Sequence, residues 1–381
     1  MNKKLTILFL SWRDIKAPKK GGAEVYTHEM LKRVDKDKYN IIHFSPLYEG
    51  GKEEEVIDGI KYIRKGNILS VIYHSIKYYR KNRKNIDYVV DQCNTHRFFA
   101  PLWVSKAKRI FFIHQFTRDI WFRNMKFPVS HIGYRLENTF LRFSRKDNTM
   151  TVSNSTMNDL IDIGFDKDKV KILPEGINFE HWDKKDFMDK EDDPTFIYVG
   201  RYAKYKGIDD AVEAFGKFKE KTSKGKLWLV GKRNDTYIKE KLQPICDKYE
   251  ITIGEDEIND DVVTFGFVSD EKKLELMSRS HILLFPSNRE GWGLIVTEAA
   301  AVGTPSIVYN SAGLVDAVDN GKAGMITSEN NHNAILGLME ELYFDDKSYE
   351  AVRNAAYDFS LKFHWDHTAV HFDRFITNIE G

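Results

Sequence analysis

The chain has 381 residues, 42% of them hydrophobic and 30% charged, and at ~100 to 200 residues per domain this length predicts two domains. Such a composition excludes a disordered chain, a collagen-like repeat and a small disulfide scaffold. The charge is divided unevenly. Residues 1–170 hold 32 Lys and Arg against 19 Asp and Glu, a net charge of +13, whereas residues 171–381 hold 26 against 38, a net charge of −12.

Cysteine usage and hydropathy bear on the compartment. Cys93 and Cys246 lie one in each half, so no disulfide can form within a domain, which favours a reducing cytosol. The apolar run Leu5–Leu10 is shorter than the ~7 to 15 residues of a signal-peptide core. No stretch approaches the ~20 apolar residues that cross a bilayer. We expect a cytoplasmic protein whose membrane contact is at most peripheral, at the inner face of the membrane.

Short apolar runs alternate with longer amphipathic segments along the whole chain. This alternation is typical of parallel strands covered by helices, so we predict an α/β fold with two doubly wound, Rossmann-like sheets. The predicted strands are Leu5–Leu10, Tyr39–Phe44, Tyr88–Val90, Arg109–Ile113 and Thr149–Val152 in the first half, and Thr195–Val199, Lys226–Val230, Val262–Phe265, His281–Phe285 and Pro305–Val308 in the second.

The charged segment Lys184–Pro194 predicts an exposed linker between the halves. We expect one domain over residues 1–175 and a second over 176–360. The helical pattern from Phe359 to Ile379 predicts a C-terminal helix, over residues 361–381, that packs back on the first domain. With two sheets facing each other, the cleft between them is the expected ligand site, because ligands bind outside the carboxyl ends of parallel strands.

The strongest motif begins where the predicted strand His281–Phe285 ends. Glu290 stands directly before Gly291, Trp292 and Gly293, which open a predicted helix that continues through Glu298. The glycines let the backbone approach a ligand, and the free amides of a helix's first turn favour a phosphate. An ordinary turn, with an acid that complements the helix dipole, is nearly as good an interpretation of this motif alone.

Two more clusters follow predicted strand ends. They are Gly200-Arg201 with Lys204 and Lys206, and the Gly21-Gly22 pair that opens a predicted helix. Cations at the end of a strand can neutralise a diphosphate leaving group. Alone, the first cluster also fits a solvated charge run and the second an ordinary surface turn.

Together these motifs resemble the retaining, nucleotide-sugar-dependent glycosyltransferases of family 4, which have the GT-B fold of two Rossmann-like domains. The resemblance covers nearly the whole chain, with the motifs in the family's order. The matching residues are Gly21-Gly22, His114, Ser153, Gly200-Arg201, Lys206 and the Glu290/Glu298 pair.

The resemblance implies a role for each matched position. The implied catalytic residues are His114, beside the scissile bond, Arg201 and Lys206, on the departing diphosphate, and Glu290, on the hydroxyls of the donor sugar. The implied donor-binding residues are Gly21, Gly22, Gly200, Gly231, Val263, Phe267, Gly291, Trp292, Gly293, Leu294 and Glu298. Among these, Glu298 binds the ribose. Base recognition in such folds is largely through backbone and loop shape, here expected around Gly231, Val263 and Gly266-Phe267. Uridine is the commoner donor base in the family, so we expect a UDP-sugar.

Acceptors bind to the N-terminal domain in this family. The residue after His114 is Gln115, where the family has an aspartate or a similar small residue, and Arg118, Trp121, Phe122 and Arg123 follow. Aromatic and basic groups together suit a sugar or a lipid phosphate, although a Trp-Phe pair is also common in a plain core. We assign Gln115, Arg118 and Trp121 to the acceptor side.

The spacing of the carboxylates argues against glycoside hydrolysis. Glu290 and Glu298 bracket a mostly helical segment of roughly 12 Å, whereas hydrolase carboxyl pairs lie ~5 to 9.5 Å apart. The Asp-x-Asp motifs at Asp35 and Asp166 lie in lysine-rich polar connections. We therefore expect no metal ion and no cofactor apart from the nucleotide-sugar co-substrate.

The basic half contains a run, Ile60–Lys84, in which tyrosines and aliphatic residues alternate with lysines and arginines. As one helix it suits an anionic membrane surface, where each cation contributes ~1 kcal/mol. A helix with a buried apolar face and a solvated basic face is an equally good interpretation. No nucleic-acid motif accompanies the charge, so we expect no nucleic-acid partner.

The expected function is transfer of a hexose or N-acetylhexosamine from a nucleoside diphosphate sugar to a hydroxyl of a sugar, lipid-linked or protein acceptor, in cell-surface polysaccharide or glycoconjugate synthesis. The resemblance implies retention of configuration by a front-face route in which the leaving phosphate helps to deprotonate the acceptor. A sugar-nucleotide epimerase, a phosphorylase and a non-enzymatic basic surface-binding protein are the alternatives.

Overall fold

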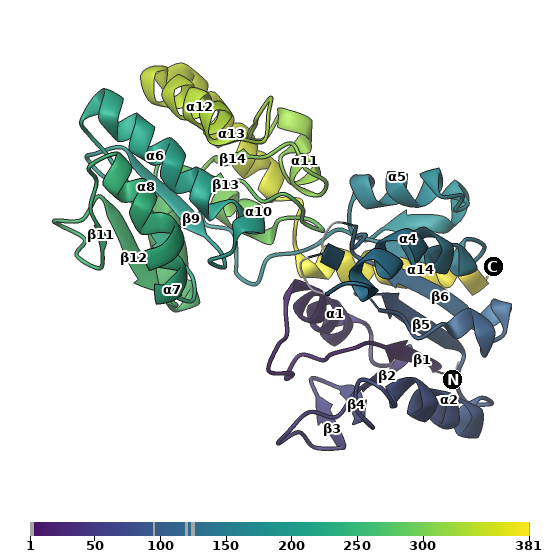
Figure 1. The fold of residues 1–381 in the computed structure, drawn as a ribbon. Coiled ribbons are helices and arrows are strands. Elements are labelled where there is room, and N and C mark those ends of the chain that lie inside the picture. Colours follow the sequence, from purple (N-terminus) through teal and green to yellow (C-terminus); the bar gives the residue numbers. More distant parts are fainter. Residues whose placement is uncertain (1–3, 94–95, 119–120, 123–125, 381) are drawn as a thin grey trace. The chain divides into compact units, whose positions relative to one another are not determined.

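The computed structural model describes residues 4–93, 96–118, 121–122 and 126–380. The chain forms two compact units: unit 1 comprises Met1–Gly176 and His364–Gly381, and unit 2 comprises Ile177–Phe363. In each unit helices cover both faces of a largely parallel sheet (Figure 1). The predicted α/β fold with two Rossmann-like sheets is confirmed.

In the described residues, the sheet of unit 1 has eight strands in the order β3-β4-β2-β1-β5-β6-β7-β8, and only β3 and β4 pair antiparallel. The strands are β1 Leu5–Leu10, β2 Tyr39–Ser45, β3 Glu54–Ile57, β4 Ile60–Arg64, β5 Tyr88–Cys93, β6 Arg109–Ile113, β7 Asn148–Thr151 and β8 Val170–Ile172. The helices are α1 Gly22–Arg33, α2 Val71–Asn82, α4 Val129–Leu141, α5 Asn154–Asp162 and α14 Trp365–Glu380.

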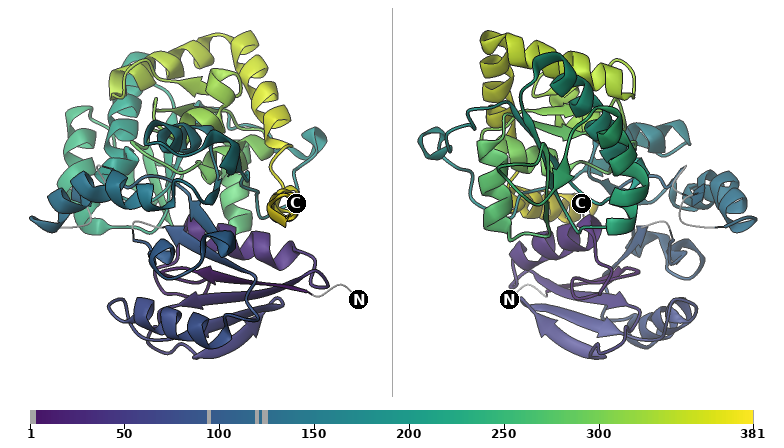
Figure 2. Two further views of the ribbon diagram at one scale, coloured as in Figure 1. Left: turned by 90° about the vertical axis from the view of Figure 1, so that its right-hand side faces the viewer. Right: turned by 60° about the vertical axis from the view of Figure 1, so that its left-hand side comes forward.

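The alternation of side chains along β1 explains the two covered faces of this sheet. Ile7 and Phe9 pack with α1 and α14, whereas Leu8 and Leu10 point the other way and pack with α2. Figure 2 shows α1 and α2 on opposite faces. The Tyr39 hydroxyl donates a hydrogen bond to Asp373 Oδ1 of α14 at 2.8 Å and so links this helix to unit 1.

The sheet of unit 2 has seven strands among the described residues, in the order β11-β12-β10-β9-β13-β14-β15. The strands are β9 Thr195–Val199, β10 Lys226–Val230, β11 Ile253–Gly254, β12 Val262–Gly266, β13 Ile282–Phe285, β14 Ser306–Val308 and β15 Met325–Ile326. The helices are α6 Ile208–Thr222, α7 Asp235–Tyr237, α8 Gln243–Lys248, α9 Asp270–Arg279, α10 Leu294–Ala301, α11 Leu314–Ala317, α12 His332–Phe344 and α13 Asp346–Ser360. Phe196 and Tyr198 of β9 pack with α6, α8 and α12, while Ile197 and Val199 pack with α9, α10 and α11.

Each sheet has one place where the strand order reverses. In unit 1, β2 pairs with one edge of β1 and the later strand β5 pairs with the other edge. In unit 2, β10 and β13 pair with the two edges of β9 in the same way. Loops after two such neighbouring strands diverge to opposite faces and leave a crevice at the carboxyl ends. The β1/β5 and β9/β13 strand ends are therefore where ligand-binding residues are expected.

The interpretation of Ile60–Lys84 as one helix is wrong. Ile60–Arg64 is strand β4, and α2 begins only at Val71. The side chain of Arg64 is fully buried, because it pairs with Asp14 and Glu55 inside the unit. α2 itself buries Val71 and Tyr79 and exposes its basic residues, which matches the alternative of a buried apolar face and a solvated basic face.

The helical pattern from Phe359 to Ile379 also breaks into two pieces, because α13 ends at Ser360 and α14 begins at Trp365. Phe363 packs against Trp292 in unit 2, whereas Trp365 packs against Tyr26 in unit 1. Five short or peripheral strands were not predicted: β3, β4, β8, β11 and β15.

Both cysteines are buried free thiols, and burial raises the pKa of each to about 12. Among the described residues, no helix has the length and apolar character needed to span a membrane.

Candidate functional site

Two loops of unit 2 meet at the carboxyl ends of β9 and β13. The turn Lys204–Lys206 follows β9, and the loop after β13 contacts it through the Asn288 amide, which donates to the Tyr205 carbonyl at 2.9 Å. Gly207 has a φ of 72°, and a Cβ there would lie 2.0 Å from the Pro286 carbonyl oxygen. Only glycine permits so close an approach of the two loops.

This approach brings together a cation and an acid that the sequence had singled out separately. Lys206 Nζ donates to Glu290 Oε1, and each side chain is 17% exposed. Lys206 is also 5.3 Å from the centroid of the Tyr205 ring. The ion pair lies at the carboxyl ends of β9 and β13. There the ammonium can bind a phosphate, and the carboxylate can accept hydrogen bonds from hydroxyl groups.

Arg201 supplies a second cation at the same edge. Its carbonyl accepts the Tyr198 hydroxyl at 2.9 Å, and the preceding Gly200 amide donates to the Val230 carbonyl at 2.9 Å, which together hold this backbone. The Arg201 side chain is exposed and forms no hydrogen bond or ion pair with the described residues. Its charge is therefore available to an anionic ligand.

The loop after β13 ends in the first turn of α10, which presents backbone amides. Gly293, with a φ of 115°, caps the helix, and Leu294 is its first residue. Amides of a first helical turn have no intrahelical partner and favour an anion. The Trp292 side chain does not contribute, because it is buried against Phe363 and its indole nitrogen donates to Thr297 Oγ1 at 2.9 Å. Gly291 and Trp292 can therefore contact a ligand only through backbone atoms.

Glu298, in the second turn of α10, is held by a residue that the sequence analysis missed. Lys273 of α9 places its Nζ 2.7 Å from Glu298 Oε2. Burial raises the pKa of the Glu298 carboxyl, and the charge of Lys273 opposes that rise. Because Lys273 lies 25 residues earlier on a different helix, no local pattern connects the two. Glu290 and Glu298 thus have separate cationic partners.

The predicted base-binding residues divide into two groups. Gly231 follows β10, and its amide donates to the Gly266 carbonyl at 2.9 Å, so both glycines lie at strand ends. Phe267 is 88% exposed and free to contact a ligand. The Val263 side chain lies within β12 and is buried in the core against α9 and α10, so only its backbone is left for the predicted base contact.

In unit 1, His114 follows β6 and is almost fully buried. Its ring packs edge-on against Tyr26 at 4.9 Å, and its Nε2 lies 3.3 Å from Gln92 Nε2. Burial lowers the pKa of His114 to about 3. The imidazole is therefore neutral at physiological pH and can hydrogen-bond to a sugar, but it cannot serve as a cationic acid.

Two further histidines, the half-buried His281 and the buried His43, resemble His114 in this respect: burial lowers the pKa of His281 to about 4 and lowers that of His43. Unfolded imidazoles titrate near ~6.5, so below that pH the unfolded chain binds protons that the folded protein does not. We expect the free energy of unfolding to fall as the pH drops from ~6.5 toward ~4. Urea titrations at about pH 7.5 and about pH 5 measure this difference; equal stability at both would contradict it.

The glycine pair of unit 1 opens α1 as predicted, but its first amide is occupied. Gly21 N–H donates to Glu24 Oε2 at 2.6 Å, and Arg13 Nε lies 3.1 Å from Glu24 Oε1. The space beside Gly22 is open within 4 Å of an added Cβ. A ligand at this turn therefore meets Gly22 and the Arg13–Glu24 pair.

Ser153 has a structural role in the described contacts. It caps α5 by accepting the Thr156 amide at 3.2 Å, and Thr156 Oγ1 in turn donates to the His114 carbonyl at 3.0 Å. Ser153 thereby positions Thr156, which in turn holds the backbone of His114.

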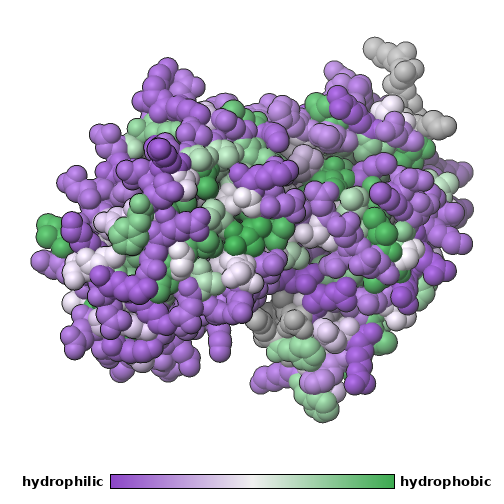
Figure 3. Space-filling view, turned by 90° about the horizontal axis from the view of Figure 1, so that it is seen from above, coloured by the Kyte–Doolittle hydropathy of each residue, from purple (hydrophilic) through white to green (hydrophobic). Residues whose placement is uncertain are grey.

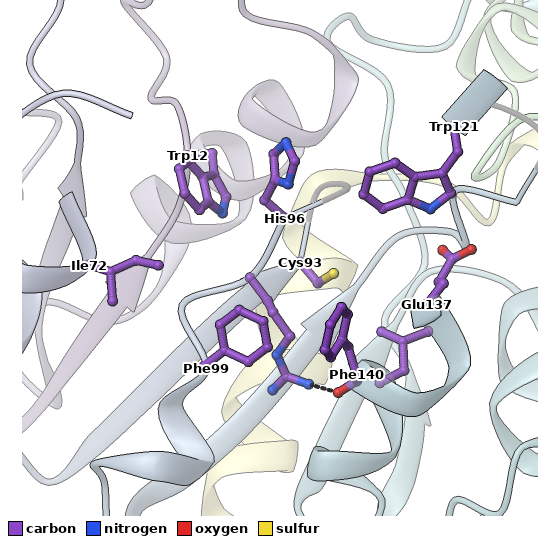
Figure 4. A pocket seen from close by; sticks show the side chains of 10 residues that line it. Trp12, Ile72, Cys93, His96, Phe99, Trp121, Glu137 and Phe140 are labelled. Atoms are coloured by element: carbon purple, nitrogen blue, oxygen red, sulfur yellow. Dashed lines mark hydrogen bonds between the residues drawn. The ribbon is translucent and has the colours of Figure 1, made fainter. Parts of the chain in front are cut away.

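An apolar pocket of about 220 Å³ lies at the carboxyl ends of β1 and β5 and includes Trp121 (Figure 4). Trp12, two residues after β1, and His96 stand beside it, with 5.9 Å between the His96 and Trp121 ring centroids. The buried indole nitrogens of Trp12 and Trp121 have no hydrogen-bond partner in the part of the chain that the structure describes. Trp12 was not predicted as a site residue, although its position just after the end of β1 was a usable signal.

The other acceptor-side residues do not line this pocket. Arg118 stacks over Phe116, with 4.6 Å from its guanidinium carbon to the ring centroid, and donates to Asn138 Oδ1 at 3.1 Å. Gln115 is half-buried, and its Oε1 has no partner among the described residues. Arg123 lies outside the described residues.

Neither Asp-x-Asp motif forms part of a cluster that could hold a metal. Across residues 4–380, apart from the gaps given above, no group of three or more His, Cys, Asp or Glu side chains has a suitable arrangement. Asp35 and Asp166 instead accept backbone amides two residues later, at 2.7 and 3.1 Å.

Comparison with known proteins identifies the family. Residues 20–181 match the family described as Glycosyltransferase Family 4, and residues 180–359 match Glycosyl transferases group 1. The chain belongs to the family 4 glycosyltransferases. Among curated members, the capsular polysaccharide biosynthesis glycosyltransferase CapM of Staphylococcus aureus is 28% identical over 189 residues, 48% of this chain and 47% of that protein. The chain spans about half the length of the curated relatives it matches.

Solved structures place this family 4 chain in the GT-B fold. Sucrose-phosphate synthase from Thermosynechococcus elongatus has a TM-score of 0.74 and 16% identity, with 99% of each chain covered. HepE from Anabaena, solved with UDP and glucose, has a TM-score of 0.70 and 14% identity, covering 98% of this chain and 99% of that one.

Proposed function

We propose that the protein is a retaining glycosyltransferase that moves a hexose or N-acetylhexosamine from a UDP-sugar to an acceptor hydroxyl. The observation that carries this proposal is the Lys206–Glu290 pair between the loops after β9 and β13. It sets a cation for the diphosphate beside a carboxylate for the sugar, at a strand-order reversal where such sheets bind ligands. The UDP and glucose in HepE support the donor, and the role of CapM supports cell-surface polysaccharide or glycoconjugate synthesis.

In this mechanism the protein supplies charge and position rather than a nucleophile. Arg201, Lys206 and the first amides of α10 stabilise the negative charge that develops on the diphosphate as the bond to the anomeric carbon breaks. The leaving phosphate takes the proton of the acceptor hydroxyl on the same face of the sugar, so the configuration is retained. Neutral His114 donates or accepts hydrogen bonds without changing its charge.

We assign the acceptor to unit 1, where the pocket beside Trp121 offers an apolar wall and two indole N–H groups that no described residue accepts. The net charge of +13 in residues 1–170 supports a location at the anionic inner face of the membrane as part of this proposal.

Incubation with nucleotide sugars, with and without candidate acceptors, tests the proposal through diphosphate release and the anomeric configuration of the product. The wild-type protein should release UDP from a UDP-sugar faster when an acceptor is present, and Glu290→Ala, checked for folding by circular dichroism, should lose most of that release. Acceptor-independent conversion of the sugar would indicate an epimerase. Absence of release with every nucleotide sugar, or an inverted product, would contradict the proposal.

Metal chelation gives an independent prediction. Because Arg201 and Lys206 supply the positive charge for the diphosphate, EDTA should leave the transfer rate unchanged. Loss of activity in EDTA that Mn²⁺ or Mg²⁺ restores would show that these side chains are insufficient.

A further inference from the structure

Helix α4 turns its small and polar residues toward unit 1. Its buried residues are Ser130, Gly133, Glu137 and Leu141. A Cβ on Gly133 would lie 2.5 Å from the Trp121 ring, and the Glu137 carboxylate accepts the Arg118 amide at 2.8 Å. Close backbone approach at Gly133, the Glu137 hydrogen bond and the apolar contacts of Leu141 and Phe140 hold the helix in unit 1.

Beside this buried face, α4 exposes a row of apolar side chains to solvent. The exposed apolar residues of this row, with the Phe143 that follows, are Val129, Ile132, Leu136, Phe140 and Phe143, each 36% to 53% exposed. Phe140 is shared with the pocket of Figure 4, where its ring packs edge-on against Phe99 at 5.6 Å. The residues of this row are three or four positions apart, so they form one stripe along the helix. Polar residues dominate the face of the molecule seen in Figure 3, with hydrophobic residues in small groups. A continuous exposed apolar stripe marks an interaction surface.

The charges around this stripe have one sign. Five basic residues of the segment 126–146 are exposed: Lys126, Arg135, Arg142, Arg145 and Lys146. The single acid in the segment, Glu137, is buried. Beyond the end of α4, a surface hollow of about 380 Å³ is lined by Lys106, Arg142, Arg145 and Lys146 beside Phe143. Arg109 in the same hollow is already paired with Asp147 at 2.7 Å.

We propose that this α4 surface, the apolar stripe together with the basic hollow, docks on an anionic phospholipid bilayer. The stripe enters the boundary of the acyl chains, and the hollow holds lipid phosphates through its lysines and arginines. A helix of 13 residues is ~20 Å long, too short to span and suited to lie in the interface. The inference specifies the surface for the membrane contact in the proposed function and does not depend on the transfer reaction.

The proposal moves the membrane contact from α2, which the sequence suggested, to α4. α2 has exposed cations, including Lys77, Arg80 and Lys81, and its Val71 and Tyr79 are committed to the core. Its exposed apolar residues, Ile68, Leu69 and Tyr73, lie just before it and in its first turn and form no stripe along it. Salt screens electrostatic attraction beyond a Debye length of ~8 Å, so exposed cations alone hold a membrane weakly. α2 therefore provides a matched control of similar charge.

Flotation with vesicles of phosphatidylcholine alone, or mixed with phosphatidylglycerol, tests the surface without any measurement of transfer. The wild-type protein should float with the mixed vesicles only. Ile132→Ser with Leu136→Ser should weaken binding roughly tenfold or more, and Arg145→Ser with Lys146→Ser should weaken it about fivefold per cation removed. The control, Lys77→Ser with Arg80→Ser, should change binding less than either.

Because the α4 variants could alter folding, each is first compared with the wild type by circular dichroism. A second measurement uses an environment-sensitive dye on Ile132→Cys, whose emission should shift to the blue with mixed vesicles, whereas the dye on Lys77→Cys should not shift. Equal partitioning to both vesicle types, binding unchanged in the α4 variants, or a larger loss in the α2 control would overturn the proposal. So would a lipid-independent dimer that Ile132→Ser dissociates, since a second copy would then cover the stripe.

Discussion

Lys206→Met is expected to slow sugar transfer by ~10² to 10³, the scale for loss of one preorganised group that stabilises developing charge. The substitution keeps the length of the side chain but removes the ammonium that contacts Glu290. The Glu290 carboxylate is then uncompensated and repels the diphosphate, which adds to the loss. Steady-state UDP release at saturating acceptor measures the effect, and the loss should be concentrated in kcat.

Lys204→Met is the matched control. Lys204 stands in the same turn and is exposed, but it does not contact Glu290. Its removal lowers the local positive charge without touching the pair, so a small change in KM and little change in kcat are expected. Equal losses for both variants would show that net charge at this edge, rather than the Lys206–Glu290 geometry, controls the reaction.

Arg64→Met is expected to cost about 3 to 5 kcal/mol in the free energy of unfolding, the range for removal of one partner from a buried ion pair. Arg64 and Asp14 are fully buried and in direct contact, and Arg64 also pairs with Glu55. Without the guanidinium, Asp14 would be a buried charge without its main partner. Because Asp14 lies in the β1–α1 loop, this loop should lose order, and urea unfolding monitored by circular dichroism measures the loss.

Lys16→Met removes the other cation that pairs with Glu55. Lys16 Nζ lies 2.7 Å from Glu55 Oε2, but its side chain is 53% exposed. Exposed pairs contribute roughly 0 to 1 kcal/mol, so this variant should unfold almost like the wild type. A loss in Lys16→Met as large as that in Arg64→Met would mean that burial does not decide the strength of this network.

The sequence by itself determined the fold class, all ten central strands that were predicted and the places where motifs follow strand ends. A run such as Leu5–Leu10 or Thr195–Val199 is apolar on both sides because helices cover both faces of the sheet, and that requirement is visible in the local pattern. Likewise, Glu290 and Gly293 lie in the short segment after the buried strand β13, and a glycine and charged residues there indicate that the chain has left the sheet.

Only the tertiary structure decided which of these residues meet. Lys206 and Glu290 are 84 positions apart and touch because β9 and β13 are neighbours; strand order is a property of the whole sheet and leaves no local signal. The pairing of Glu298 with Lys273, the burial of Arg64 and the exposure of the apolar stripe of α4 have the same origin. Periodicity shows that a helix or strand has two chemically different faces, but what covers each face depends on the packing of elements distant in sequence.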